Sequence, residues 1–428
     1  MNRKNCGGVG ENIGKRMVKI ITKKNYRGEV RQGVQRNIVP LASLIENSPQ
    51  NGYSPICPNE PTGKWVLGLS SLSEQCLDLS EAKPAPANDP LVDRFLLRHG
   101  DFLISRSNTI DKVGRVGVFR GGLDNCSYPD LMMRFRPDTS KIYPDYLEVY
   151  LRSEATVKYI QSHATGTSGS MKKINQSIVE SIPILLPPPD DQKKIAAIHT
   201  AWDTAIEKTE KLIEAKKKQF KWLLKMFLGR TSETAKWRRV KLGEVAEIAV
   251  KEKLQTVYDE TLLTVKLHCK GIEKNSRMSP RLTERGRPYY KRHAGEFLIG
   301  RQNFHNGGFG IVPDEFDGFI ASNAITSLKI NKDKLSSTFL FYFFSRETYY
   351  KRIGHIMDGT GQKELSDKQI LNLQLRIPSV QHQKQIASTL NTARHEIDLL
   401  KKQAEAYRKQ KRGLMQKLLT GQWRVKTK

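Results

Sequence analysis

The 428-residue sequence predicts an α+β fold in which two globular domains of mixed α/β structure are separated by two long antiparallel helices that form a coiled-coil spacer. Three observations predict this fold. One passage occurs twice with a constant spacing, each copy contains a long segment without proline, and the apolar residues of both segments follow a heptad pattern. The chain is therefore expected to be a pseudo-twofold internal repeat.

The repeat is clearest at the start of each long segment. At an offset of 191 residues, 186–196 matches 377–387, and both stretches contain proline, then glutamine, then isoleucine-alanine. The match needs no gap between 169 and 228. Upstream, HGDFLISRSN at 99–108 resembles AGEFLIGRQN at 294–303. Self-similarity at so long a period indicates a duplicated structural unit.

The two long segments are predicted to be helices over 190–228 and 381–419. Prolines precede each of them, and Gly229 and Gly421 follow them. At 1.5 Å per residue each helix would be about 57 Å long. A single amphipathic helix on a globular core is the ordinary alternative, but a helix of this length would overhang a domain of about 150 residues.

The apolar residues of both helices recur at alternating spacings of four and three, which is typical of a coiled coil. Two matching stripes in one chain can bury each other, and a globular domain between them favours antiparallel pairing. The predicted seam consists of Ile195, Trp202, Ile206, Ile213, Leu223, Ile386, Leu390, Ile397, Leu400 and Leu414.

The predicted domain order follows from these helices. It comprises a basic N-terminal extension (1–37), a first globular domain (38–189), a first spacer helix (190–230), a second globular domain (231–380) and a second spacer helix (381–425).

The composition favours a polyanionic partner. The chain has 72 Lys and Arg against 44 Asp and Glu, a formal charge of +28, and nucleic acid is the commonest partner for such an excess. A solvated lysine-rich face is the alternative. No apolar run approaches the roughly 20 residues that span a bilayer, so no membrane partner is expected. The N-terminus lacks a signal-peptide pattern and the five cysteines form no C-x-x-C pair, which favours a cytoplasmic location.

Polar residues directly follow the two matching FLIS and FLIG stretches, which are predicted to be strands. Arginine, asparagine and glutamine pair bidentately with guanine and adenine edges, so these residues are candidates for base contact. The alternative is that they cap the strand or touch only phosphate. The candidates are Arg106, Ser107, Asn108, Arg301, Gln302 and Asn303.

Two glycine-containing loops, 165–173 and 359–363, offer backbone amides together with lysine, a combination suited to phosphate. An ordinary turn before a strand is the alternative. The phosphate candidates are Thr167, Ser168, Lys172, Lys173, Thr360, Gln362 and Lys363.

No motif of a methyltransferase or nuclease is found. The sequence has no N/D-P-P-Y/F stretch and no G-x-G-x-x-G after a strand, and GGVGENIGKR at 7–16 has Arg16 where a phosphate-binding loop needs Ser or Thr. The nine histidines lack the spacing of metal ligands. The sequence therefore predicts no catalytic residue and no metal site.

The pattern as a whole resembles the DNA-specificity (S) subunits of type I restriction–modification systems. That family has two target-recognition domains, each followed by a long spacer helix. Its marks are a G-T/S-G…K-x-I/L loop (here 166–174 and 360–365), the proline-glutamine helix start described above, and an L-L-x-G end (here LLKMFLGR and LMQKLLTG). The resemblance covers Ile38 to Val425. The N-terminal extension has no counterpart in it, and SVQHQ lacks the second proline of the helix start.

The resemblance implies a non-catalytic, sequence-specific DNA-binding subunit. Each target-recognition domain would read one half of a bipartite asymmetric site in double-stranded DNA, with the spacing set by the coiled coil. Two methylation (M) subunits and restriction (R) subunits would be the protein partners. No cofactor is expected in this chain, because S-adenosylmethionine, ATP and Mg²⁺ would be used by the partners.

Two other function classes stay open from the residues alone. One is a coiled-coil protein-interaction scaffold without specific DNA recognition. The other is a nuclease or methyltransferase with a degenerate site.

Overall fold

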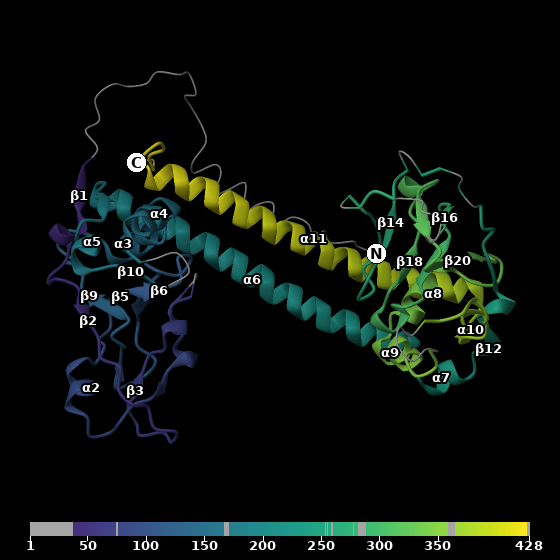
Figure 1. Cartoon of the computed structure of the whole chain (residues 1–428), viewed down its shortest axis with the longest axis horizontal. Helices are drawn as coiled ribbons and strands as arrows, with labels where there is room; N and C mark the ends of the chain where they lie inside the picture. Colours follow the sequence, from purple (N-terminus) through teal and green to yellow (C-terminus); the bar gives the residue numbers. More distant parts are fainter. Residues whose placement is uncertain are drawn as a thin grey trace, which may run out of the picture. The chain divides into compact units, whose positions relative to one another are not determined.

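The computed structural model in Figure 1 describes residues 37–73, 76–166, 171–252, 254, 256–257, 260–276, 278–280, 288–357 and 364–425. The N-terminal extension up to residue 36 lies outside this range, as do five of the phosphate candidates: Thr167, Ser168, Thr360, Gln362 and Lys363. The chain divides into two compact units, Met1–Lys208 with Ala404–Lys428, and Thr209–Gln403.

The first unit is built on an antiparallel four-stranded sheet in the order β2 (Gln50–Asn51), β9 (Met132–Phe135), β5 (Asp101–Ser105) and β7 (Val116–Phe119). Strand β5 is central and entirely buried. Phe102 and Ile104 point into one apolar cluster and Leu103 into another, because successive side chains of a strand face opposite sides of the sheet. The FLIS stretch therefore forms a strand, as predicted.

Short elements complete the first unit. Two small strand pairs are antiparallel: β1 (Ile38–Pro40) with β11 (Pro183–Leu185), and β6 (Ser107–Asn108) with β10 (Lys172–Lys173). A second sheet has the order β4 (Lys83–Pro84), β3 (Trp65–Val66) and β8 (Cys126–Ser127). The helices besides the long ones are α2 (Pro90–Arg94), α3 (Pro144–Leu151), α4 (Glu154–His163) and α5 (Gln176–Glu180), with 3-10 turns η1 (Leu41–Leu44), η2 (Leu69–Ser71) and η3 (Leu79–Glu81).

The second unit contains a sheet with the same order of strands. Its members are β13 (Ala246–Ile248), β20 (Ile325–Ile330), β17 (Phe297–Gly300) and β18 (Phe309–Ile311). The FLIG stretch is the buried β17, so it takes the central place that FLIS takes in the first unit. Strand β12 (Arg238–Lys241) pairs with β21 (Gln374–Ile377). The other helices are α7 (Ser232–Ala235), α8 (Ser337–Phe344), α9 (Glu347–Ile353) and α10 (Asp367–Leu371), with 3-10 turns η4 (Leu242–Glu244), η5 (Phe304–Asn306) and η6 (Asp314–Phe316).

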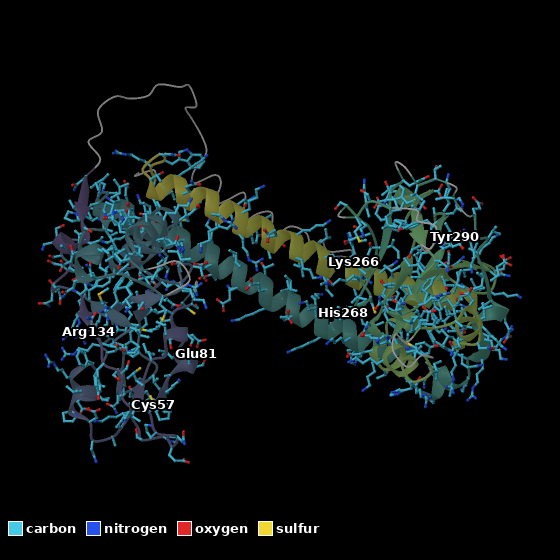
Figure 2. The ribbon with its side chains drawn as sticks, in the orientation of Figure 1. Cys57, Glu81, Arg134, Lys266, His268 and Tyr290 are labelled. Carbon is cyan, nitrogen blue, oxygen red and sulfur yellow. The ribbon has the colours of Figure 1, made fainter. Side chains whose placement is uncertain are left out.

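The second unit also contains two antiparallel strand pairs: the hairpin of β14 (Leu263–Lys266) with β15 (Gly271–Lys274), and β16 (Tyr289–Lys291) with β19 (Ile320–Ser322). Figure 2 labels Lys266 and His268 at the turn of the first pair. Arg394 donates a hydrogen bond of 2.9 Å from Nη2 to the Cys269 carbonyl at this turn. The turn is thereby attached to the second long helix within the same unit.

The two long segments are helices of 40 residues, α6 (Pro189–Leu228) and α11 (Val380–Leu419). Each begins one residue before the predicted start. Gly421 has φ +69° beyond the end of α11, a left-handed conformation that suits glycine at a helix C-terminus. No helix in the described part of the chain has the length and apolarity needed to cross a bilayer.

Within the first unit the two long helices touch. The ring of Trp202 lies 5.6 Å from that of Tyr407, edge to face, and Lys411 forms an ion pair with Asp203. Ile195 shares an apolar cluster with Met415 and residues beyond it. As the residue number rises along α6 the partner's number falls along α11, so these segments run antiparallel.

Within the second unit the helices also touch. Lys216 forms an ion pair of 2.9 Å with Glu396. Phe220 and Leu223 pack on the cluster that contains Leu390. Of the ten predicted seam residues, Ile195, Trp202, Ile213, Ile386, Leu390 and Ile397 are buried, and Ile206, Leu223, Leu400 and Leu414 are half-buried.

The glutamine of the repeated motif has the same role in both units. Gln192 is buried; its Oε1 accepts from the Tyr143 amide at 2.8 Å and its Nε2 donates to the Pro187 carbonyl. Gln383 is buried as well; its Oε1 accepts from the Ser336 amide at 2.9 Å, and its Nε2 donates to the Pro378 carbonyl. Each glutamine joins its long helix to the N-terminus of a short helix, α3 or α8. The first amides of a helix have no partner within that helix, so they can donate to the glutamine.

Candidate nucleic-acid interface

In the first unit Arg106 lies directly after the central strand β5 and is half-buried. Its amide donates to the Leu131 carbonyl at 2.8 Å. Its guanidinium makes a long contact of 3.5 Å, from Nη1 to the Asp130 carbonyl. A contact of that length is weak. The backbone of Arg106 is therefore fixed by a hydrogen bond, whereas its guanidinium is only weakly bound.

The β6–β10 pairing places the two kinds of candidate side by side. Asn108 lies opposite Lys172, and Ser107 lies opposite Lys173. The sequence separates these residues by more than sixty positions, and only the fold brings them together. In the first unit the predicted base-contact and phosphate-contact residues thus share one small surface.

The side chains at this surface are differently engaged. Asn108 accepts from the Thr109 amide through Oδ1 and donates to Ser105 through Nδ2, so this asparagine acts in part as a local cap. Ser107 has a buried hydroxyl without a hydrogen-bond partner among the described residues. Lys172 donates to the Gly166 carbonyl, whereas Lys173 is exposed.

In the second unit Arg301 occupies the corresponding place after the central strand β17. Its Nη2 lies 3.0 Å from Oε1 of Glu364, and its buried Nε has no hydrogen-bond partner in the described part of the chain. Gln302 is half-buried and Asn303 is exposed. The Asn303 carbonyl accepts from the Gly308 amide at 2.8 Å, which shapes the turn η5.

Glu364 is a residue that the sequence reasoning did not single out. It falls on Lys173 at the repeat offset of 191, which is the signal that could have identified it. Close by, Asp367 accepts from Thr326 at 2.7 Å and forms an ion pair with Lys251 at 3.1 Å. The second unit therefore carries a glutamate where the first carries Lys173.

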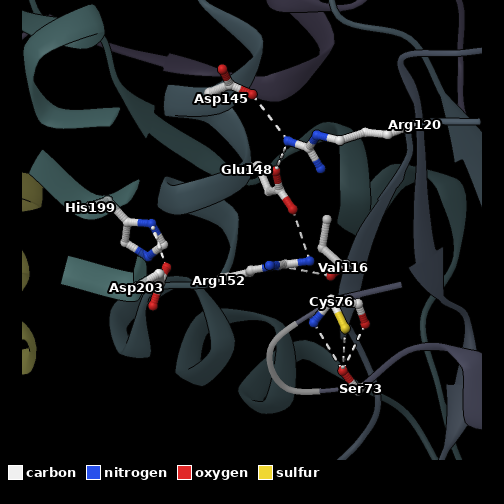
Figure 3. Close-up of polar contacts among 9 residues, drawn as sticks. All are labelled: Ser73, Cys76, Val116, Arg120, Asp145, Glu148, Arg152, His199 and Asp203. Carbon is white, nitrogen blue, oxygen red and sulfur yellow. Dashed lines mark hydrogen bonds and ion pairs between the residues drawn. The ribbon is translucent and has the colours of Figure 1, made fainter. Parts of the chain in front are cut away.

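A polar network lies behind the first unit's sheet. Figure 3 shows the buried Glu148 of α3 between Arg120, which follows β7, and Arg152, which ends α3. Arg152 also donates to the Val116 carbonyl at 3.1 Å. The network ties the edge strand β7 to the helix α3.

His199 of α6 lies near this network and contacts Asp203 at 3.1 Å (Figure 3). Burial, followed by the charge of Lys411, lowers the pKa of His199 to about 4. The imidazole is therefore neutral at pH 7, and it occupies a place on the apolar stripe of α6 without bringing a charge into it.

The described part of the chain contains no cluster of metal-ligating side chains, and an open cavity of the second unit includes no candidate site residue. Among the described residues no group of three or more His, Cys, Asp or Glu side chains could hold a metal ion. An open cavity of about 520 Å³ lies in the second unit beside Trp237 and His382. None of its lining residues is a predicted site residue.

The chain is similar to proteins of one family. The family model described as "Type I restriction modification DNA specificity domain" matches residues 90–217 and 234–406, which together exceed half of the chain. A putative type I restriction enzyme MjaX specificity subunit of Methanocaldococcus jannaschii is 27% identical over 442 residues, which cover 95% of this chain and 97% of that protein. The type I restriction enzyme MjaVIII specificity subunit of the same organism is 25% identical over 304 residues, which cover 66% of this chain and 71% of that protein.

A solved structure has the same fold. The S subunit of the type I restriction–modification system from M. genitalium superposes with a TM-score of 0.58, at 13% identity, over 92% of this chain and 98% of that one. At so low an identity the likeness concerns the fold alone.

Proposed function

The chain belongs to the family of type I restriction–modification DNA specificity domains, and we propose from this membership that it selects the DNA sequence on which a type I complex acts. The observation that carries this function is the match of the family model in both units. The prediction of a specificity subunit, made from the doubled helix-start motif, is confirmed by that match and by the relative that is similar over nearly its whole length.

The chain acts without catalytic residues of its own, as the relatives' description as specificity subunits indicates. The alternative of a scaffold that binds only protein is not favoured. The charge of +28 supplies the sequence-independent attraction to phosphates that a DNA reader needs.

Each unit reads one half of a bipartite, asymmetric site, and the two long helices form a coiled-coil spacer in a pseudo-twofold repeat. Three observations support this part of the proposal: the sheets share one strand order, the helices contact each other in each unit, and the sequences of the two units differ outside the repeat. A stiff spacer helps because the second reader then binds with its position already fixed, at little additional ordering cost.

The partners are double-stranded DNA, methylation subunits and restriction subunits. Two copies of the methylation subunit fit a duplicated chain, because a pseudo-twofold protein offers the same surface twice. S-adenosylmethionine, ATP and Mg²⁺ belong to those partners.

A binding assay tests the function. The full chain, alone and combined with the methylation subunits of its system, is incubated with a library of randomised duplexes at several salt concentrations, and bound duplexes are sequenced. We expect enrichment of two short conserved blocks separated by unconserved positions, with affinity that falls as salt rises. Binding that stays independent of both sequence and salt would support the scaffold instead.

A further inference from the structure

The two candidate loops place different charges at one matched backbone position. In the first unit the Ile174 amide donates to the Arg106 carbonyl at 2.9 Å, and in the second the Leu365 amide donates to the Arg301 carbonyl at 3.1 Å. The residue before each of these amides is Lys173 or Glu364. The same backbone bond therefore places the backbone of a lysine near that of the arginine in one unit, and the backbone of a glutamate there in the other.

In the first unit this position carries an arginine and a lysine. No carboxylate of the described residues forms an ion pair with Arg106 or Lys173. Two unneutralised cations suit phosphate oxygens, or the acceptor atoms O6 and N7 of guanine.

In the second unit the arginine is neutralised and the carboxylate is the more accessible partner. The side chain of Arg301 is 19% exposed and that of Glu364 is 39% exposed. Arg301 donates a hydrogen bond from Nη2 to Oε1 of Glu364. An ionised carboxylate has about four acceptor positions on its two oxygens. Glu364 thus keeps acceptor capacity on a side chain that is partly exposed.

A carboxylate at a DNA-binding surface has few favourable partners. Phosphates repel it, and the duplex presents hydrogen-bond donors in the major groove only at the amino groups of cytosine N4 and adenine N6. Glutamate is a known acceptor for the cytosine amino group. At a DNA-binding surface Glu364 therefore gains only from a base that presents such an amino group.

We propose that Glu364 is a base-reading residue of the second unit that accepts a hydrogen bond from the amino group of cytosine, and that Arg301 positions it. The matched Lys173 of the first unit contacts phosphate. This inference rests on the proposed function, since it requires that the chain reads DNA. The exchange of Lys173 for Glu364 at this matched position would then be one reason why the two half-sites differ in sequence.

The test begins with the duplex that the wild-type chain selects from the randomised library. Glu364→Gln keeps the shape of the side chain but replaces one acceptor oxygen by a donor amide. We expect this variant to lose cytosine preference at one base pair of one half-site, by about tenfold in relative affinity, while the other half-site is unchanged. Arg301→Lys should retain part of that preference and Arg301→Ala should lose it.

Two matched variants serve as controls. Glu247→Gln makes the same change of charge at an exposed carboxylate of β13 and should alter no base preference. Lys173→Gln should weaken binding to all duplexes alike and reduce the salt dependence by about one phosphate contact.

The outcomes separate the two proposals. If Glu364→Gln selects the same bases as the wild type with a normal melting temperature, Glu364 does not read a base and this inference is wrong, while the proposed function stands. If the wild-type chain with its methylation subunits selects no sequence, both fall.

Discussion

At the scale of single residues, the buried glutamine of the repeated motif explains why that motif occurs twice. Gln192 and Gln383 each accept a hydrogen bond from the start of another helix and donate one to a proline carbonyl. No other side chain of that length both accepts and donates without a charge. The sequence shows that the glutamine repeats, and the contacts show what it does.

Gln383→Leu should therefore destabilise the second unit by about 1–3 kcal/mol, because the substitution removes the partner of the half-buried Ser336 amide and of the Pro378 carbonyl. Urea unfolding followed by tryptophan fluorescence measures this change. Gln385→Leu, at an exposed position of the same helix, is the control and should change the free energy of unfolding by less than about 0.5 kcal/mol. Equal effects of the two variants would contradict the assigned role.

His199 gives a prediction for pH. Its pKa in the folded chain is about 4, below the ordinary value of 6.5, so the unfolded chain takes up the proton first as the pH falls. The stabilisation from the neutral imidazole is complete above pH 6.5 and is lost as the pH falls from 6.5 towards 4. Between pH 7.5 and pH 5 this loss amounts to about 2 kcal/mol.

The free energy of unfolding of the wild type should thus fall more steeply over this interval than that of His199→Gln. Urea titrations at the two pH values measure the difference. His395→Gln, an exposed histidine of α11, should behave like the wild type. Parallel pH profiles for wild type and His199→Gln would show that the histidine titrates normally.

At the scale of elements, burial decides which residues of the long helices contribute to stability. Leu390 and Ile397, which the apolar spacing assigns to the predicted seam, are buried. Leu399 lies only two residues beyond Ile397 but is 51% exposed, because a helix turns each residue by about 100° from the last. The period of the pattern, and not the presence of leucine, marks the packed face.

Leu390→Ala should cost about 2–5 kcal/mol, since a fully buried leucine leaves a cavity when it is truncated. Leu399→Ala makes the same chemical change on the exposed face and should cost less than about 1 kcal/mol. Thermal unfolding of the two variants compares them directly. A similar loss in both would show that Leu390 does not pack in the second unit's core as described.

At the scale of the whole molecule, the two units share a strand order and differ in their surfaces. Arg106 holds only a long contact with a carbonyl, whereas Arg301 forms an ion pair. The sequence treats the two arginines as equivalent candidates. The structure shows that only the first has a guanidinium without a carboxylate partner among the described residues.

Arg106→Ala should therefore relax base preference in one half-site only and leave the other unchanged, with a loss of about 1–3 kcal/mol for the best duplex. Sequencing of duplexes selected by the variant measures the preference at each position. A uniform loss of affinity across both half-sites would mean that Arg106 contacts phosphate, which is the alternative that the sequence leaves open.

The sequence by itself determined the two long helices, the central strands β5 and β17 and the family, because a helical or alternating apolar pattern is a local property that repeats along the chain. The order of strands in the sheets, the pairing of Ser107 with Lys173, and the ion pair between Arg301 and Glu364 were decided only by the tertiary structure. The last two of these contacts join residues more than sixty positions apart. No local preference of the chain encodes which separate segments meet when its apolar surfaces are buried together.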